Sequence, residues 1–114
     1  ASMDESTAGI DDWQRLDLRI GTVVDVQPFP RARNPSWKVA VDLGPLGIRW
    51  SSAQITNYPP EALVGTQVTC VCNLSPRNIA GFASELLILG GRDPSGAVML
   101  LSPRSPVPNG ARVE

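Results

Sequence analysis

The sequence contains no histidine among its 114 residues, and only two cysteines and few aromatic residues. Without histidine the chain cannot form a Ser-His or Cys-His catalytic pair, and it lacks the most common protein ligand for metals. No other nucleophile stands beside a base in a recognisable motif. We therefore expect a binding protein that has no metal ion and no cofactor, and not an enzyme.

The two cysteines, Cys70 and Cys72, are spaced i, i+2 in an expected strand. Both side chains then point to the same face, and this spacing is poorly suited to a disulfide between them. A metal site would need two further soft ligands that the chain does not offer. We expect two small buried thiols, and hence a protein of a reducing compartment, the cytoplasm.

Long apolar runs are also missing, since none approaches the ~20 residues that span a bilayer. We expect no membrane insertion and no signal peptide. The length suits one domain with its own core. Ala1 and Ser2 before Met3 are interpreted as a cloning remnant, and residues 1–10 as a disordered lead to a single domain over residues 11–114.

The net charge of −1 is unevenly distributed. The first 17 residues sum to −4, whereas residues 18–92 sum to +3. Nine of the ten basic residues are arginine, the side chain suited to bidentate and stacked contacts. A mildly basic body can meet RNA phosphates, but it is less basic than a dedicated nucleic-acid binder, so solvated surface charge is the default interpretation.

Frequent proline (11) and glycine (10) interrupt short apolar runs, a pattern that favours an all-β domain. Helical turns are expected at residues 10–16 and 58–65, and strands at residues 18–27, 36–43, 48–54, 67–73, 85–89 and 97–101. Strands two and three form a hairpin around the turn at residues 44–47. Alternation predicts that the first strand buries Leu18, Ile20, Thr22, Val24 and Val26.

This order predicts an OB-fold type five-stranded barrel with a short N-terminal helix and a C-terminal extension. A β-sandwich is the alternative, because it produces short strands at similar spacing. In an OB-fold the ligand lies across strands two and three and the loops beside them. Here those loops are residues 29–36 and 75–83.

The segment from Asn73 to Glu85 is interpreted as a basic loop, broken by Pro and Gly and held between two apolar strands. Phe82 is the preferred aromatic anchor, because no local pattern buries it. Arg77 fits surface charge or an ion pair with Glu85 equally well, and Trp37 and Trp50 fit core or dimer contacts. The candidate peptide-binding or RNA-binding residues are Phe29, Arg31, Arg33, Lys38, Trp50, Ser52, Asn73, Arg77, Ile79, Phe82, Ser84 and Leu87.

Several motifs in chain order resemble the tRNA-binding domain family: Asp17–Gly21, Asn73-Leu74, Gly81–Glu85 and Pro106–Gly110. The resemblance covers roughly residues 11–114. It implies an OB-fold domain of the kind appended to some aminoacyl-tRNA synthetases and found in free-standing dimers. Within the family, residues 29–35, 51–56 and 76–82 resemble most the branch of export-related chaperones.

That branch implies a homodimer that binds unfolded or precursor polypeptides for protein export, with the export machinery as a further partner. Peptide capture requires exposed apolar surface beside polar groups. A dimer is also expected because the turn around Trp13 and Leu16 and the Pro-rich tail from Ser102 bury little on their own barrel.

The alternative is a structure-dependent tRNA-binding protein that uses the same surface. Arg31, Arg33, Lys38, Arg49 and Arg77 would contact phosphates, and Phe82 or Trp50 would stack a base. Ser52, Asn73 and Ser84 match the family pattern. In contrast, Leu86-Leu87 replace the Gly-Met pair typical of tRNA-binding relatives. This difference favours polypeptide binding over tRNA binding.

Overall fold

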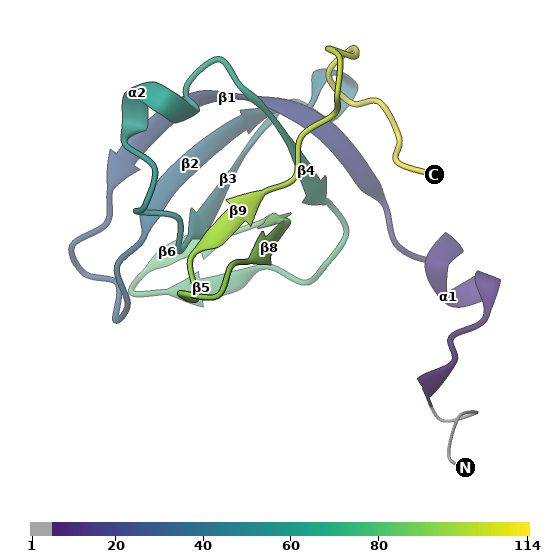
Figure 1. The fold of residues 1–114 in the computed structure, drawn as a ribbon, viewed down its shortest axis with the longest axis horizontal. Coiled ribbons are helices and arrows are strands. Elements are labelled where there is room, and N and C mark those ends of the chain that lie inside the picture. Colours follow the sequence, from purple (N-terminus) through teal and green to yellow (C-terminus); the bar gives the residue numbers. More distant parts are fainter. Residues whose placement is uncertain (1–5) are drawn as a thin grey trace.

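A five-stranded antiparallel sheet that curls into a barrel dominates the computed structural model, which describes residues 6–114 (Figure 1). The strands lie in the order β3-β2-β1-β4-β7. Their bounds are Leu18–Pro28 for β1, Trp37–Asp42 for β2, Ile48–Ala53 for β3, Gln67–Val71 for β4 and Leu87–Ile88 for β7. The predicted all-β, OB-type barrel is therefore confirmed.

Small two-stranded ribbons and short helices complete the fold of residues 6–114. The ribbons are β5 (Arg77–Ile79) with β6 (Phe82–Ser84), and β8 (Gly90–Arg92) with β9 (Val98–Leu100); the helices are α1 (Ile10–Gln14), η2 (Gly44–Leu46) and α2 (Pro60–Leu63). No helix in residues 6–114 has the length and apolarity needed to cross a bilayer. Residues 1–5 of the predicted lead lie outside the described residues, and Ile10, its last residue, begins α1.

The barrel closes between β3 and the segment that leaves β6. The backbone N–H of Glu85 donates to the carbonyl of Trp50 at 2.8 Å, and the N–H of Ser52 donates to the hydroxyl of Ser84 at 3.0 Å. A side-chain oxygen thus replaces a carbonyl that a regular ladder would supply. The sequence predicted no such bond.

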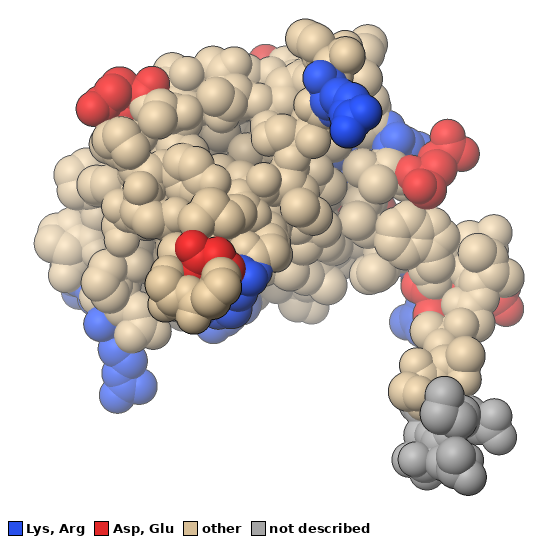
Figure 2. Space-filling model, viewed as in Figure 1, with Lys and Arg blue, Asp and Glu red and all other residues tan. Residues whose placement is uncertain are grey.

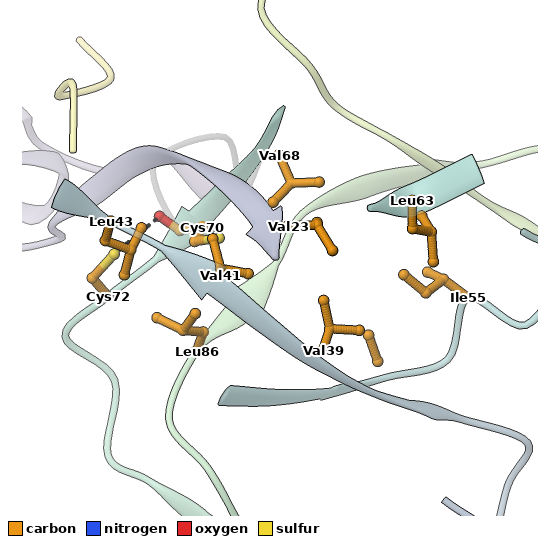
Figure 3. Packing of buried hydrophobic residues seen from close by; sticks show 11 residues of the cluster. Val23, Val39, Val41, Leu43, Ile55, Leu63, Val68, Cys70, Cys72 and Leu86 are labelled. Atoms are coloured by element: carbon orange, nitrogen blue, oxygen red, sulfur yellow. Dashed lines mark hydrogen bonds between the residues drawn. The ribbon is translucent and has the colours of Figure 1, made fainter. Parts of the chain in front are cut away.

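Small aliphatic side chains fill the interior, and the two cysteines pack among them (Figure 3). Cys70 and Cys72 are both buried and free, as the sequence predicted. Burial raises the pKa of the Cys70 thiol to about 12 and also raises that of Cys72. The buried members are Val23, Val39, Val41, Leu43, Ala53, Ile55, Leu63, Val68, Cys70, Cys72 and Leu86.

A β-bulge changes which residues of β1 face the core. Val23 pairs with Val41 and Asp25 with Ala40, so Val24 has no partner in β2. Val23 is 1% exposed and Val24 is 41% exposed. The prediction that Val24 is buried is therefore wrong. Alternation could not locate the bulge, because two adjacent valines fit either face.

The segment predicted as a loop after Asn73 contains the β5–β6 hairpin instead. Ile79 pairs with Phe82, and the two turn residues between them, Ala80 and Gly81, have φ values of 49° and 84°. Two positive φ angles are typical of a type I′ turn, which matches the twist of the strands it joins. Alanine at the first of these positions is uncommon, so the usual sequence signal for this turn is missing.

Two predicted strands are shorter than expected. The strand expected over residues 67–73 ends at Val71, and the one expected over residues 85–89 comprises only Leu87–Ile88. Leu87 is 47% exposed. The strand expected over residues 85–89 is apolar on both faces, a pattern that predicts cover on both faces. The exposure of Leu87 shows that this prediction is wrong, because an apolar side chain is left at the surface.

The Pro-rich C-terminal segment runs along the outside of β1. The N–H of Gly110 donates to the carbonyl of Ile20 at 2.7 Å, and the N–H of Ile20 donates to the carbonyl of Ala111 at 2.9 Å. The N–H of Val113 likewise donates to the carbonyl of Leu18 at 2.9 Å. The tail is ordered by its own barrel, so the expectation that it needs a partner chain is wrong.

Close packing of β1 on β2 predicts that Gly21→Ala destabilises the protein. A Cβ atom there would lie 2.5 Å from the Cγ1 atom of Val41 and 2.7 Å from the carbonyl oxygen of Asp42. We expect the free energy of unfolding in urea to fall by ~2–3 kcal/mol. Gly91→Ala, where nothing lies within 4 Å, is the control. Equal urea midpoints for the two variants would contradict this packing.

Candidate functional site

The β5–β6 hairpin lies beside β3, over the outer face of the first three strands (Figure 1). The registers pair Gln27 with Lys38 and Lys38 with Ser52, so these side chains form one row across β1, β2 and β3. Trp50 lies two residues before Ser52, on the same face of β3. We call this row, Trp50, Phe29 and residues 74–87 the hairpin surface.

Three aromatic rings and one ammonium group meet at its centre. The Phe82 ring lies edge-on to Phe29, with centroids 5.3 Å apart, and to Trp50, with centroids 6.3 Å apart. The Lys38 Nζ atom is 4.9 Å from the centroid of each phenylalanine ring. Cation–π attraction from both rings restricts the position of this charge.

The two phenylalanines are less exposed than the sequence predicted. Phe29 is 5% exposed, so it forms a wall of the cluster and is not a free surface side chain. Phe82 is half-buried and belongs to strand β6, not to a loop. Long-range contacts with Phe29 and Trp50 bury it, and no local pattern reveals such contacts.

Two of the pockets beside the hairpin contain most of the candidate residues. A pocket of about 350 Å³ adjoins the aromatic cluster and is lined by Gln27, Lys38, Trp50, Phe82, Ala83 and Glu85. A pocket of about 150 Å³, which we call the apolar pocket, lies between the hairpin and β7. It is lined by Ser52, Leu74, Ser75, Arg77, Ile79, Ser84, Glu85, Leu86 and Leu87.

The apolar pocket unites five of the predicted site residues. Ser52, Arg77, Ile79, Ser84 and Leu87 all line it, although they come from four different strands. Its volume suits one large aliphatic side chain. The pocket therefore combines an apolar floor with hydroxyl and guanidinium groups at its rim.

Arg77 is free to contact a ligand. It is exposed and makes no ion pair with Glu85; within residues 6–114 the structure contains one ion pair, between Arg19 and Asp17 at 2.8 Å. The alternative that Arg77 is paired with Glu85 is therefore wrong.

Other basic residues are spread over the surface. Arg31 lines a hollow next to Phe29, Lys38 and Phe82, whereas Arg33 lies on the far side of its loop, beside Trp37. Figure 2 shows basic and acidic side chains scattered over one face of the molecule instead of gathered in one patch. The structure thus brings Arg31 to the cluster and leaves Arg33 outside it.

Asn73 has a structural role that the sequence did not predict. Its Oδ1 atom accepts from the backbone N–H of Asp17 at 2.8 Å, and its Nδ2 atom donates to the carbonyl of Arg15 at 2.7 Å. Both ends of the amide are engaged in holding the link between α1 and β1. One lone pair and one N–H of the amide stay free, so the predicted role of Asn73 as a donor or acceptor for a ligand stays a prediction beside this structural role.

Sequence reasoning missed Gln27, Leu74 and Glu85 as pocket residues. Gln27 could have been found from its position opposite Lys38 once strands one and two were paired. Glu85 was considered as a polar group of the loop and as an ion-pair partner of Arg77, but not as a binding residue. Within the described part of the chain, no cluster of three acidic or thiol side chains is placed to hold a metal ion.

The fold and the hairpin surface define a class of protein: a ligand-binding β-barrel of the OB type, with aromatic, basic and apolar groups on one outer face. A model of the putative tRNA binding domain matches residues 18–112. The chain belongs to the tRNA-binding domain family, as its motifs predicted.

Solved structures of two chaperones share this fold over nearly the whole chain. The chaperone CsaA of Bacillus anthracis str. Ames is 45% identical with a TM-score of 0.90, covering 96% of this chain and 100% of that chain. The CsaA chaperone protein of Picrophilus torridus is 34% identical with a TM-score of 0.90, covering 95% of this chain and 100% of that one.

Curated relatives include much longer proteins. The methionine–tRNA ligase of Porphyromonas gingivalis (strain ATCC BAA-308 / W83) is 35% identical over 104 residues, which are 91% of this chain and 15% of the ligase. This chain thus spans about 15% of the length of the curated relatives it matches. The shared part is a tRNA-binding domain.

The structural role of Asn73 predicts that Asn73→Ala destabilises the protein. Loss of two hydrogen bonds should lower the free energy of unfolding by ~1–2 kcal/mol. Asn34→Ala, at an exposed position whose side chain makes no hydrogen bond within residues 6–114, should stay within about 0.5 kcal/mol. A stable Asn73→Ala protein that no longer binds its ligand would show that Asn73 acts in the ligand site and not in this structural role.

Proposed function

We propose that this protein is a CsaA-like molecular chaperone that binds unfolded or precursor polypeptides for protein export, as a cytoplasmic homodimer. The observation that carries the proposal is the apolar pocket beside the unpaired Arg77. Similarity to two CsaA chaperones over their whole length supports it.

An unfolded polypeptide exposes large apolar side chains next to free backbone amides, and the hairpin surface offers partners for both. Leu74 and Leu87 at the apolar pocket are 43% and 47% exposed. Burial of one leucine side chain of a client there contributes roughly 1.5–3 kcal/mol. The hydroxyl of Ser75 and the guanidinium of Arg77 can donate hydrogen bonds to the adjoining backbone carbonyls.

The edge of β5 offers a second kind of contact. Within residues 6–114, β5 pairs with β6 and with no other strand. Its outer edge therefore presents backbone N–H and C=O groups to an extended chain, which is how many domains add a peptide to a sheet. Such bonds do not depend on the client sequence, as a chaperone requires.

Replacing Leu87 by Ser should weaken client binding while the protein stays folded. Leu87 is half exposed, so the change removes apolar surface from the pocket and little from the core. We expect about a tenfold loss of affinity for an unfolded reporter polypeptide by calorimetry, corresponding to ~1.4 kcal/mol.

Val64→Ser is the matched control, because Val64 is also 47% exposed but lies after α2, outside both pockets. Equal client affinity for Leu87→Ser and Val64→Ser would remove the apolar pocket from the proposed function.

The homodimer is proposed because α1 projects from the barrel (Figure 1) and the apolar side chains in and next to it are exposed. Ile10 is 67% exposed, Trp13 40% and Leu16 38%. These side chains and Val113 line a hollow of about 400 Å³ beside the chain end. A second copy related by a two-fold axis would cover this surface.

Sedimentation at micromolar concentration should therefore give about twice the chain mass of 12.2 kDa. Trp13→Ser combined with Leu16→Ser should give the mass of a single chain, because the apolar contact is lost. Ile48→Ser, at a residue that is 58% exposed on β3, should remain dimeric. A monomeric unmodified protein would refute the dimer.

A second candidate function is structure-dependent tRNA binding, which the family match and the Lys38 cluster favour. Aromatic rings beside a fixed cation suit stacked bases and phosphates. Because residues 18–92 sum to only +3, the electrostatic part of such binding would be modest and sensitive to salt.

A further inference from the structure

The pocket of about 350 Å³ beside the aromatic cluster, which we call the aromatic pocket, carries opposite charges. The ammonium of Lys38 and the carboxylate of Glu85 both line it, and they form no ion pair with each other within residues 6–114. The pocket therefore offers a hydrogen-bond donor with positive charge and an acceptor with negative charge. A ligand that fits both must be anionic at one point and carry N–H donors at another.

The Glu85 carboxylate is largely available. Its Oε1 atom accepts from the backbone N–H of Trp50 at 3.4 Å, longer than the usual 2.7–3.2 Å. Its second oxygen accepts no hydrogen bond within the described residues. A carboxylate weakens the attraction of a surface for phosphates, so its presence beside Lys38 favours a ligand whose own N–H groups it binds.

Between the charged groups lie two aromatic rings at an angle of 89°, so that a flat base can stack on one ring and contact the other at its edge. Trp50 and Phe82 are both half-buried, so part of each ring remains open to the pocket. The indole N–H of Trp50 makes no hydrogen bond within residues 6–114. Unpaired nucleobases stack on such rings while their edges are read by side chains.

We propose that the aromatic pocket binds one unpaired guanosine nucleotide of an RNA. Guanine packs against Trp50 and Phe82, its adjacent N1–H and N2 amino groups donate to Glu85, and a phosphate accepts from Lys38. The Watson–Crick edge of guanine has two adjacent donors, whereas adenine, cytosine and uracil each bring an acceptor lone pair towards the carboxylate. This inference rests on the tRNA-binding candidate and is independent of the chaperone proposal.

Short single-stranded RNAs test the inference directly. We would measure fluorescence anisotropy of labelled hexauridylate with one central guanosine, inosine or adenosine. Inosine differs from guanosine only in lacking the N2 amino group. The guanosine oligonucleotide should bind about tenfold tighter than the adenosine one, as expected for one bidentate base contact, with inosine in between.

Variants of Glu85 and Lys38 separate the preference for guanosine from the general electrostatic attraction of the protein for RNA. Glu85→Gln should abolish the preference for guanosine while the adenosine oligonucleotide binds as well or better, because a repulsive charge is removed. Glu61→Gln, on the exposed face of α2, makes the same change of charge elsewhere and should preserve the preference. Lys38→Met should weaken all the oligonucleotides alike and reduce the log–log salt slope by about 1.

The outcomes are distinguishable. Equal affinity for the three oligonucleotides together with clear tRNA binding would overturn the guanosine site and leave the tRNA-binding candidate standing. Absence of any RNA binding would overturn both and leave the chaperone proposal untouched. If Glu85→Gln alters the affinity for an unfolded polypeptide but not for the guanosine oligonucleotide, the aromatic pocket belongs to the polypeptide site and the inference is refuted.

Discussion

Closure of the barrel between β3 and residues 84–86 is the constraint on which the rest of the structure depends. Four hydrogen bonds within residues 6–114 make this seam. The hydroxyl of Ser51 donates to the carbonyl of Leu86 at 3.0 Å, and the hydroxyl of Ser84 accepts from the N–H of Ser52 at 3.0 Å. The N–H of Glu85 donates to the carbonyl of Trp50 at 2.8 Å, and the N–H of Trp50 donates to the Glu85 carboxylate at 3.4 Å. Because the β5–β6 hairpin ends where the seam begins, closing the barrel also places the hairpin over the outer face of β3. Leu86 therefore belongs both to the core and to the lining of the apolar pocket.

The hairpin divides this face into two chemically different pockets. The apolar pocket on the β7 side has leucines and an unpaired guanidinium, which suits a polypeptide. The aromatic pocket has Lys38, Trp50 and Phe82, which suits a nucleotide. Glu85 lines both. Under the two proposals above, small changes on either side of one hairpin would shift the preferred ligand between polypeptide and RNA. The relatives of this chain include chaperones and parts of tRNA ligases.

Much of the barrel was predictable from local pattern, and the errors share one cause. Alternation located β2 and β3 and the turn between them, and the spacing of Cys70 and Cys72 correctly predicted buried thiols. The bulge at Val24 and the hairpin after Asn73 were missed. In both cases the local sequence carries no deciding signal: two adjacent valines fit either face of β1, and the turn residues Ala80 and Gly81 differ from the usual Asn-Gly or Asp-Gly pair.

The sequence by itself determined the class of fold, the family and the chemical types of the candidate site, because periodicity, turn residues and motifs are local properties of the chain. Only the tertiary structure decided which candidates are free to bind. Asn73 is engaged by the segment before β1, Phe29 is buried beside Phe82, and Arg77 forms no ion pair within residues 6–114. Each of these outcomes depends on residues far apart in the sequence, whose distance in space is set by how the barrel closes.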